Sequence, residues 1–168
     1  MKEVFAAIAS QENGIFKTTD KKYVGQRGSA VLVSYYHLDI AYKGYRIVIN
    51  YELGNHNLAK IEMELHPGIT IPEISITNRS HYYRLFYRKA NILKVESSNI
   101  TFKKYLEDLL FSTNLETLAR ENLFEPRIII SRKDRAKVLT TDFHLAFSNK
   151  KDVLYAIVAF YKGIVDWL

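Results

Sequence analysis

The most informative feature of this sequence is an absence, because its 168 residues include no cysteine. A disulfide framework, a thiol nucleophile, an iron–sulfur cluster and any zinc site with cysteine ligands are therefore excluded. A cysteine-free chain is compatible with a reducing compartment, and we expect a cytoplasmic protein.

Long apolar runs and glycine-rich loops are also missing. The longest apolar run, residues 153–161, is well short of the roughly 18 residues that a membrane-spanning helix needs. The apolar stretch 4–9 is shorter than the roughly 7–15 residues of a signal-peptide core, so we expect a short N-terminal helix there. The glycines form neither GxGxxG nor a Walker A loop, and no G-x-S-x-G elbow occurs. Those nucleotide-binding and serine-hydrolase signatures are therefore excluded.

What the sequence does contain is typical of a globular protein. Hydrophobic residues make up 48% of the chain and charged residues 25%. The length is that of one domain, so we expect residues 1–168 to form a single, soluble globular domain. We expect no cofactor, since no pattern indicates one.

Alternating apolar residues predict antiparallel strands in the first half of the chain. Three of them are separated by short turns and lie at residues 30–42, 45–53 and about 60–65. Residues 69–77 predict a fourth strand, whose apolar phase slips at Pro72 and so indicates an edge strand or a bulge. Together these strands predict a meander over about residues 30–77.

The second half of the chain shows mainly helical periodicity. The predicted elements are helices near 101–122, a hairpin at about 126–147 and a long C-terminal helix at 149–168. Residues 80–93 are compatible with helix or strand, and we favour a short helix that ends before an extended piece at 93–95. Three N-caps are predicted, at Thr101, at Ser148 and at Thr113, the last in a capping box with Glu116.

The order of these elements predicts the fold class. Strands are followed by helices, a hairpin and a terminal helix, which indicates an α+β fold and not a βαβ fold. We expect the helices to pack on one face of the antiparallel sheet, which leaves the other face open to solvent or to a partner.

Positive charge is concentrated in three segments. The net charge is +6, and residues 17–27, 79–104 and 127–137 hold four, seven and five basic residues, each against one acidic residue. The rest of the chain is mildly acidic. Segregation of this kind attracts anionic partners if the segments converge in space, whereas three separate solvated loops are the more common outcome.

One basic segment also carries an aromatic cluster, which gives our candidate binding residues. Together with the basic pair of the predicted hairpin, they are Tyr83, Arg84, Tyr87, Arg88, Lys89, Arg132 and Lys133. Aromatic rings beside guanidinium groups suit an acidic protein segment, nucleic acid, a phosphorylated ligand or an anionic lipid headgroup. The alternative is a solvent-facing element whose tyrosines pack on the core while the arginines reach outward.

Two histidine–aspartate pairs are candidates for a metal or acid–base site. His37 with Asp39, and Asp142 with His144, are spaced so that each pair shares one face of a strand. If the pairs converged, they would supply two imidazoles and two carboxylates, although a half-exposed histidine beside a carboxylate is the more common outcome. Glu62 and Glu64 also share one face of a strand. They are candidates for a general acid–base couple, although the solvent-facing side of a strand is the more common interpretation.

From these features we expect a non-enzymatic binding or adaptor module that uses a basic-aromatic surface. The first alternative is a nucleic-acid-binding protein, although none of the common signatures is present. The second is an enzyme or ligand carrier with a pocket between the sheet and the terminal helix, lined by tyrosines and by His37 or His144.

Overall fold

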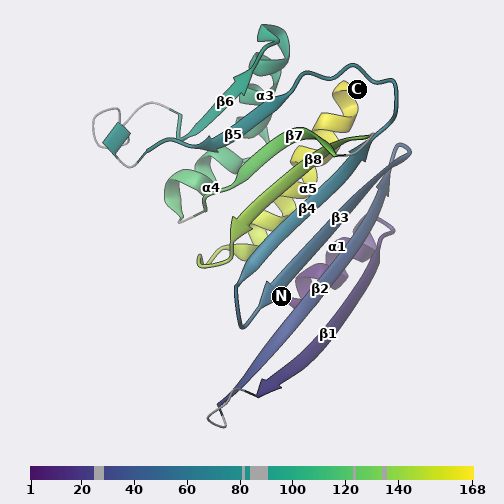
Figure 1. The fold of residues 1–168 in the computed structure, drawn as a ribbon, viewed down its shortest axis with the longest axis vertical. Helices are drawn as coiled ribbons and strands as arrows, with labels where there is room; N and C mark the ends of the chain where they lie inside the picture. Colours follow the sequence, from purple (N-terminus) through teal and green to yellow (C-terminus); the bar gives the residue numbers. More distant parts are fainter. Residues whose placement is uncertain (25–28, 81, 84–90, 123, 134–135) are drawn as a thin grey trace.

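A computed structural model describes residues 1–24, 29–80, 82–83, 91–122, 124–133 and 136–168 (Figure 1). Within these residues all the strands belong to one antiparallel sheet, in the order β1-β2-β3-β4-β8-β7-β5-β6. The strands are β1 (Ile15–Val24), β2 (Ala30–Tyr42), β3 (Tyr45–Leu53), β4 (Leu58–Leu65), β5 (Ile74–Asn78), β6 (Leu93–Ser97), β7 (Arg127–Lys133) and β8 (Ala136–His144).

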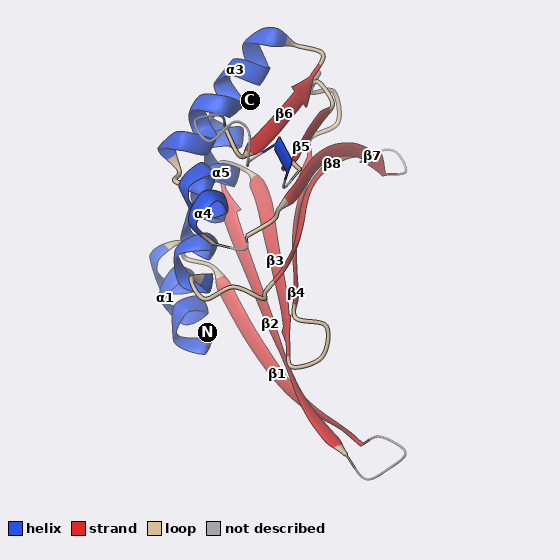
Figure 2. Cartoon of the chain, turned by 90° about the vertical axis from the view of Figure 1, so that its left-hand side faces the viewer, coloured by secondary structure: helices blue, strands red, loops and turns tan. Residues whose placement is uncertain are grey.

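The helices lie on one side of this sheet, as Figure 2 shows. They are α1 (Lys2–Gln11), α3 (Ile100–Ser112), α4 (Leu115–Glu121) and α5 (Lys150–Trp167). In the described part of the chain, no helix is long and apolar enough to cross a membrane. The predicted α+β class, with its meander, its later hairpin and its helices on one face, is confirmed.

The predicted strands form because their apolar side chains alternate with polar ones. In β3, for example, Ile47, Ile49 and Tyr51 are buried against the helices, whereas Arg46 is exposed on the opposite face. The same alternation continues on both neighbouring strands, where Leu38 and Ile61 flank Ile49. The result is a single apolar layer between the sheet and the helices.

Two strands differ from the sequence-based expectation. Strand β1 occupies residues for which the sequence pattern predicts no strand, and it pairs with β2 over its full length. Strand β5 begins only at Ile74, because Pro72 has no N–H to donate to the sheet. It pairs with β6 on one side and β7 on the other, so it is an interior strand and the edge-strand prediction was wrong.

The predicted helix starts are correct to within two residues, but the predicted caps are wrong. The side chain of Asn99, not Thr101, accepts the N–H of Phe102 at the start of α3. Asn149, not Ser148, precedes α5. Asn114 precedes α4, so Thr113 and Glu116 form no capping box.

Two buried tyrosines, Tyr161 and Tyr51, differ in whether their hydroxyl groups have hydrogen-bond partners. The hydroxyl of Tyr161, on α5, lies 2.9 Å from Thr141 Oγ1 and donates to the carbonyl of Ile61 at 3.1 Å. The hydroxyl of Tyr51 is equally buried and has no hydrogen-bond partner among the described residues. Burial raises the pKa of both hydroxyls, so both stay protonated at neutral pH.

This contrast predicts opposite effects for two matched substitutions. Tyr51→Phe removes a buried hydroxyl without a partner and should raise the free energy of unfolding by about 1 kcal/mol. Tyr161→Phe leaves Thr141 and Ile61 without their shared partner and should lower it by about 1–3 kcal/mol. Urea unfolding of the two variants checks the prediction. A destabilised Tyr51→Phe would contradict the assignment of an unsatisfied hydroxyl.

Candidate functional site

The sheet face opposite the helices is uncovered (Figure 2). Pairing between strands aligns one row across five of them. The row runs through Lys17, His37, Asn50, Lys60 and Asp142. Basic, neutral and acidic groups are mixed in it, so this row does not select for anions.

Both predicted histidine–aspartate pairs lie on this open face, but they do not converge. His37 and Asp39 are on β2, Asp142 and His144 are on β8, and β3 and β4 lie between them. Three strand spacings correspond to about 14 Å, which is too far for a shared metal ion. His37 and Asp39 are engaged locally instead. His37 Nδ1 lies 2.8 Å from Asn50 Oδ1, and the Arg46 guanidinium holds the pKa of Asp39 below its usual value.

The two glutamates of β4 lie on the open face as well. Glu62 forms ion pairs with Lys60 at 2.9 Å and with Lys133 at 3.8 Å, so its charge is balanced by neighbours on β4 and β7. Among the described residues, no group of three or more histidine, aspartate or glutamate side chains is placed to hold a metal ion. The arrangement around Glu62 is that of an ion-paired, solvated strand.

The described parts of the three basic segments do not all come together either. Lys17, Lys21 and Lys22 lie on β1 at one edge of the sheet, and Lys94 lies on β6 at the opposite edge. The basic residues of β7 lie five strands from β1, which is on the order of 20 Å. Moreover, the described residues include 19 basic against 17 acidic side chains, since five basic residues and one acidic residue fall outside them.

Few of the predicted binding residues can be placed. Tyr83 is half-buried, with the guanidinium of Arg79 4.6 Å from its ring centre. Arg132 and Lys133 are consecutive on β7 and therefore point to opposite faces of the sheet. The other four, Arg84, Tyr87, Arg88 and Lys89, lie outside the described residues. That these residues bind a partner stays a prediction.

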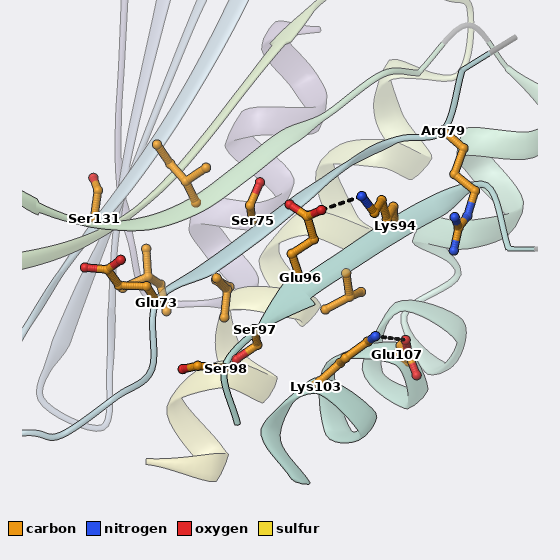
Figure 3. A pocket seen from close by; sticks show the side chains of 14 residues that line it. Glu73, Ser75, Arg79, Lys94, Glu96, Ser97, Ser98, Lys103, Glu107 and Ser131 are labelled. Carbon is orange, nitrogen blue, oxygen red and sulfur yellow. Dashed lines mark ion pairs between the residues drawn. The ribbon is translucent and has the colours of Figure 1, made fainter. Parts of the chain in front are cut away.

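A cavity with a volume of about 830 Å³ lies over the strands at the β6 edge (Figure 3). Its side chains come from β5, β6, β7 and α3, and three basic groups among them face three acidic ones. In Figure 3, Lys94 pairs with Glu96 on β6, and Lys103 lies 4.0 Å from Glu107 on α3. The Lys94 ammonium lowers the pKa of Glu96. Two basic groups are thus paired with two acidic ones, and Arg79 and Glu73 leave the lining without net charge, so the cavity favours neither an anion nor a cation.

A smaller cavity of about 440 Å³ lies between α1 and α5. Two tyrosines, Tyr42 and Tyr155, line it. Lys162 contacts both carboxylate oxygens of Glu12 there, at 2.9 and 3.1 Å. His37 and His144 lie on the opposite, open face of the sheet, so neither lines this cavity and that part of the pocket alternative was wrong.

The most unusual surface is the hairpin of β1 and β2, which sequence analysis did not single out. Pairing between β2 and β3 begins only at Ser34, so residues 21–24 and 30–33 pair with each other alone. They form a two-stranded ribbon that projects beyond the rest of the sheet, as Figure 2 shows. We call these two segments the ribbon.

Apolar side chains are concentrated on this hairpin. Five of the nine exposed large hydrophobic side chains among the described residues are Ile15, Tyr23, Val24, Val31 and Leu32. Val24 is 70% exposed and Leu32 is 61% exposed. Val31 and Leu32 lie in a predicted strand and look like core residues, so their exposure could not be seen in the sequence.

Polar contacts on the hairpin fix its geometry. The hydroxyl groups of Tyr23 and Tyr35 lie 3.1 Å apart, and the ammonium of Lys21 is 5.6 Å from the centre of the Tyr35 ring. The hydrogen bond with Tyr23 is the main reason that the pKa of Tyr35 is raised to about 12. Ser34 donates to the carboxylate of Asp20 at 2.6 Å, across from it on β1. The described part of the hairpin therefore combines apolar, aromatic and basic groups.

Comparisons of this chain with protein-family models, with curated proteins and with solved structures find no match. The class that the fold defines is thus an α+β protein with one open sheet face and an exposed edge hairpin.

Proposed function

We propose that this protein is a non-enzymatic binding module that docks other proteins through its β1–β2 hairpin. One observation carries the proposal, which is the concentration of exposed apolar side chains on a projecting element. Exposed apolar side chains gathered on one element are typical of interaction sites on folded proteins. A two-stranded ribbon is also marginally stable in water by itself, so it gains from being covered.

The chemistry of the hairpin favours a protein partner over nucleic acid. Tyr23, Val24 and Leu32 offer apolar area, and burial of such area is the dominant favourable contribution to most protein–protein association. The three lysines of β1 lie on one strand and do not meet the basic residues of β7. Nucleic-acid binding is the alternative, and it predicts affinity that falls steeply as salt rises. A cytoplasmic location is part of the proposal and stays a prediction.

A selection of binders followed by variant mapping tests the proposal. A random peptide library would be displayed and selected against the whole protein. Each selected peptide would then be measured against the double variant Tyr23→Ser/Leu32→Ser. The matched control is Ile100→Ser/Phe111→Ser, which removes two exposed apolar side chains from α3.

We expect at least a tenfold loss of affinity with the hairpin variant and less than a twofold change with the α3 variant. Circular dichroism would confirm that both variants fold. Peptides that bind the hairpin variant as well as they bind the wild type would contradict the proposal. The proposal would also be contradicted if the protein slowed the migration of nucleic acid in a gel at low salt but selected no peptide that binds the hairpin.

A further inference from the structure

We infer that the partner contributes an extended acidic segment, which adds as a further strand to the free edge of β1. This inference rests on the proposed function and specifies the mode of binding and the chemistry of the partner. The observations that carry it are the unpaired edge of β1, the lysines along that edge and the order of its side chains.

The edge itself supplies the backbone groups for such pairing. β1 is the first strand of the sheet and pairs with β2 only, over all ten residues from Ile15 to Val24. Its other side presents a row of backbone N–H and C=O groups to solvent, which is the template that strand addition uses. A third strand would also support the ribbon, whose outer half has only two strands.

The charge of β1 specifies an acidic partner. Lys17, Lys21 and Lys22 are exposed, and no ion pair within the described part of the chain involves any of them. The one acidic residue of the strand, Asp20, already accepts a hydrogen bond from Ser34. Opposite charges placed across a strand pair stabilise it, whereas like charges destabilise it.

The order of the β1 side chains on the open face specifies the sequence pattern of the partner strand. Successive residues on that face are Ile15, Lys17, Thr19, Lys21 and Tyr23, because side chains alternate along a strand. A complementary strand would read apolar, acidic, polar, acidic, apolar at every second position. This pattern is the same in both directions, so it fits parallel and antiparallel addition alike.

A second copy of this chain fits the edge less well. In the three longest antiparallel registers of β1 against itself, like charges face one another. Lys17 lies opposite Lys22 in one register and opposite Lys21 in the next, and in the third Asp20 lies opposite its own copy. Lysines on an edge strand commonly prevent self-pairing in this way.

The other sheet edge is a poorer docking strand. β6 has only five residues, and its two charged side chains on the open face, Lys94 and Glu96, neutralise each other. Its length limits the number of backbone hydrogen bonds that a partner could make. Of the two edges, β1 therefore offers both the longer template and the unbalanced charge.

A palindromic peptide tests the inference directly. The probe has nine residues, with valine at both ends, glutamate at positions three and seven, and threonine elsewhere. Two control peptides have the same length: one carries lysine in place of each glutamate, and one carries the glutamates at positions four and six. In the second control a glutamate falls opposite Asp20. Binding would be measured by NMR titration and calorimetry with the whole protein.

We expect the probe to bind at least tenfold more tightly than either control, with shift changes centred on β1. The charge-reversed variant Lys17→Glu/Lys21→Glu should prefer the lysine peptide instead. Equal binding of the probe and the controls, or none at millimolar concentration, would overturn the inference. Self-association of the free protein that Lys17→Glu/Lys21→Glu changes would also overturn it, in favour of a second copy.

These outcomes are separable from a failure of the proposed function. If the selected library peptides need Tyr23 and Leu32 but show no preference for acidic residues, the hairpin docks proteins by another mode. In that case the strand-addition inference fails and the proposed function stands. If the library peptides ignore the hairpin, both fail.

Discussion

Glu116→Ala is expected to lower the free energy of unfolding by about 3–5 kcal/mol. The Glu116 carboxylate is 2% exposed and accepts the backbone N–H groups of Ile92 and Leu93, the latter at 3.0 Å. Arg120 lies 3.3 Å from the same carboxylate. Alanine would leave two buried N–H groups without partners at the start of β6, and each such group costs about 1–3 kcal/mol.

Two control variants make this prediction specific to the buried carboxylate. Glu116→Gln keeps one acceptor oxygen and should cost less, about 1–2 kcal/mol. Glu107→Ala removes a half-buried glutamate from α3 and should change stability by less than about 0.5 kcal/mol. Urea unfolding can be followed by the fluorescence of the single tryptophan, Trp167, whose ring centre lies 4.2 Å from that of Phe102. A loss below about 1 kcal/mol for Glu116→Ala would show that Glu116 is dispensable for anchoring β6.

Gly54→Ala is also expected to lower the free energy of unfolding, by about 3 kcal/mol or more. Gly54 follows β3 with a φ of +113°, a conformation that side chains other than glycine rarely adopt. A Cβ atom at this position would lie 2.1 Å from the carbonyl oxygen of Leu32. Because that oxygen belongs to the backbone of the ribbon, relief of the clash would displace the ribbon from the end of β3.

Gly68→Ala provides the matched comparison for the Gly54 variant. Gly68 has a φ of +93°, but no described atom lies within 4 Å of the position that its Cβ would take, so alanine adds backbone strain without a clash. We expect a cost of about 1–2 kcal/mol there. In addition, Gly54→Ala should weaken the binding of the acidic peptide, whereas Gly68→Ala should leave it unchanged. Equal costs for the two variants would mean that contact with Leu32 does not matter.

Much of the fold was predictable because the relevant pattern is local. The alternation in β3 and β4 reports directly which side chains face the helices, and the turn at Lys43 and Gly44 separates two of the strands. The long apolar face of α5 identified the terminal helix in the same way. The order of the strands was not predictable, since the pairing of β4 with β8 joins segments far apart in the chain.

Strand β1 was missed for a physical reason. Eight of its ten residues are exposed and the other two are only partly buried, so burial imposes almost no alternation on its sequence. Apolar patterning predicts strands that cover a core, and the outer half of β1 covers none. The same exposure makes it a candidate site, and a sequence pattern does not report the exposure of residues such as Val31 and Leu32.

The role of Glu116 was also hidden by a local pattern. Its spacing from Thr113 fits a capping box, but the Thr113 hydroxyl donates to the carbonyl of Leu109 instead. Asn114 adopts a φ of +65°, which places Glu116 on the buried side of α4. The carboxylate then meets a strand start more than 20 residues earlier in the chain. A local motif cannot reveal a partner at that separation.

Residue-resolved hydrogen exchange along β1 tests most directly whether its free edge is the docking surface. Amide exchange would be measured by NMR for the protein alone and with a saturating selected peptide. We predict at least tenfold slower exchange at alternate amides of β1, with the amides of β6 unchanged. Slower exchange confined to β6, or to β4 and β8, with β1 unaffected, would contradict docking at the edge of β1.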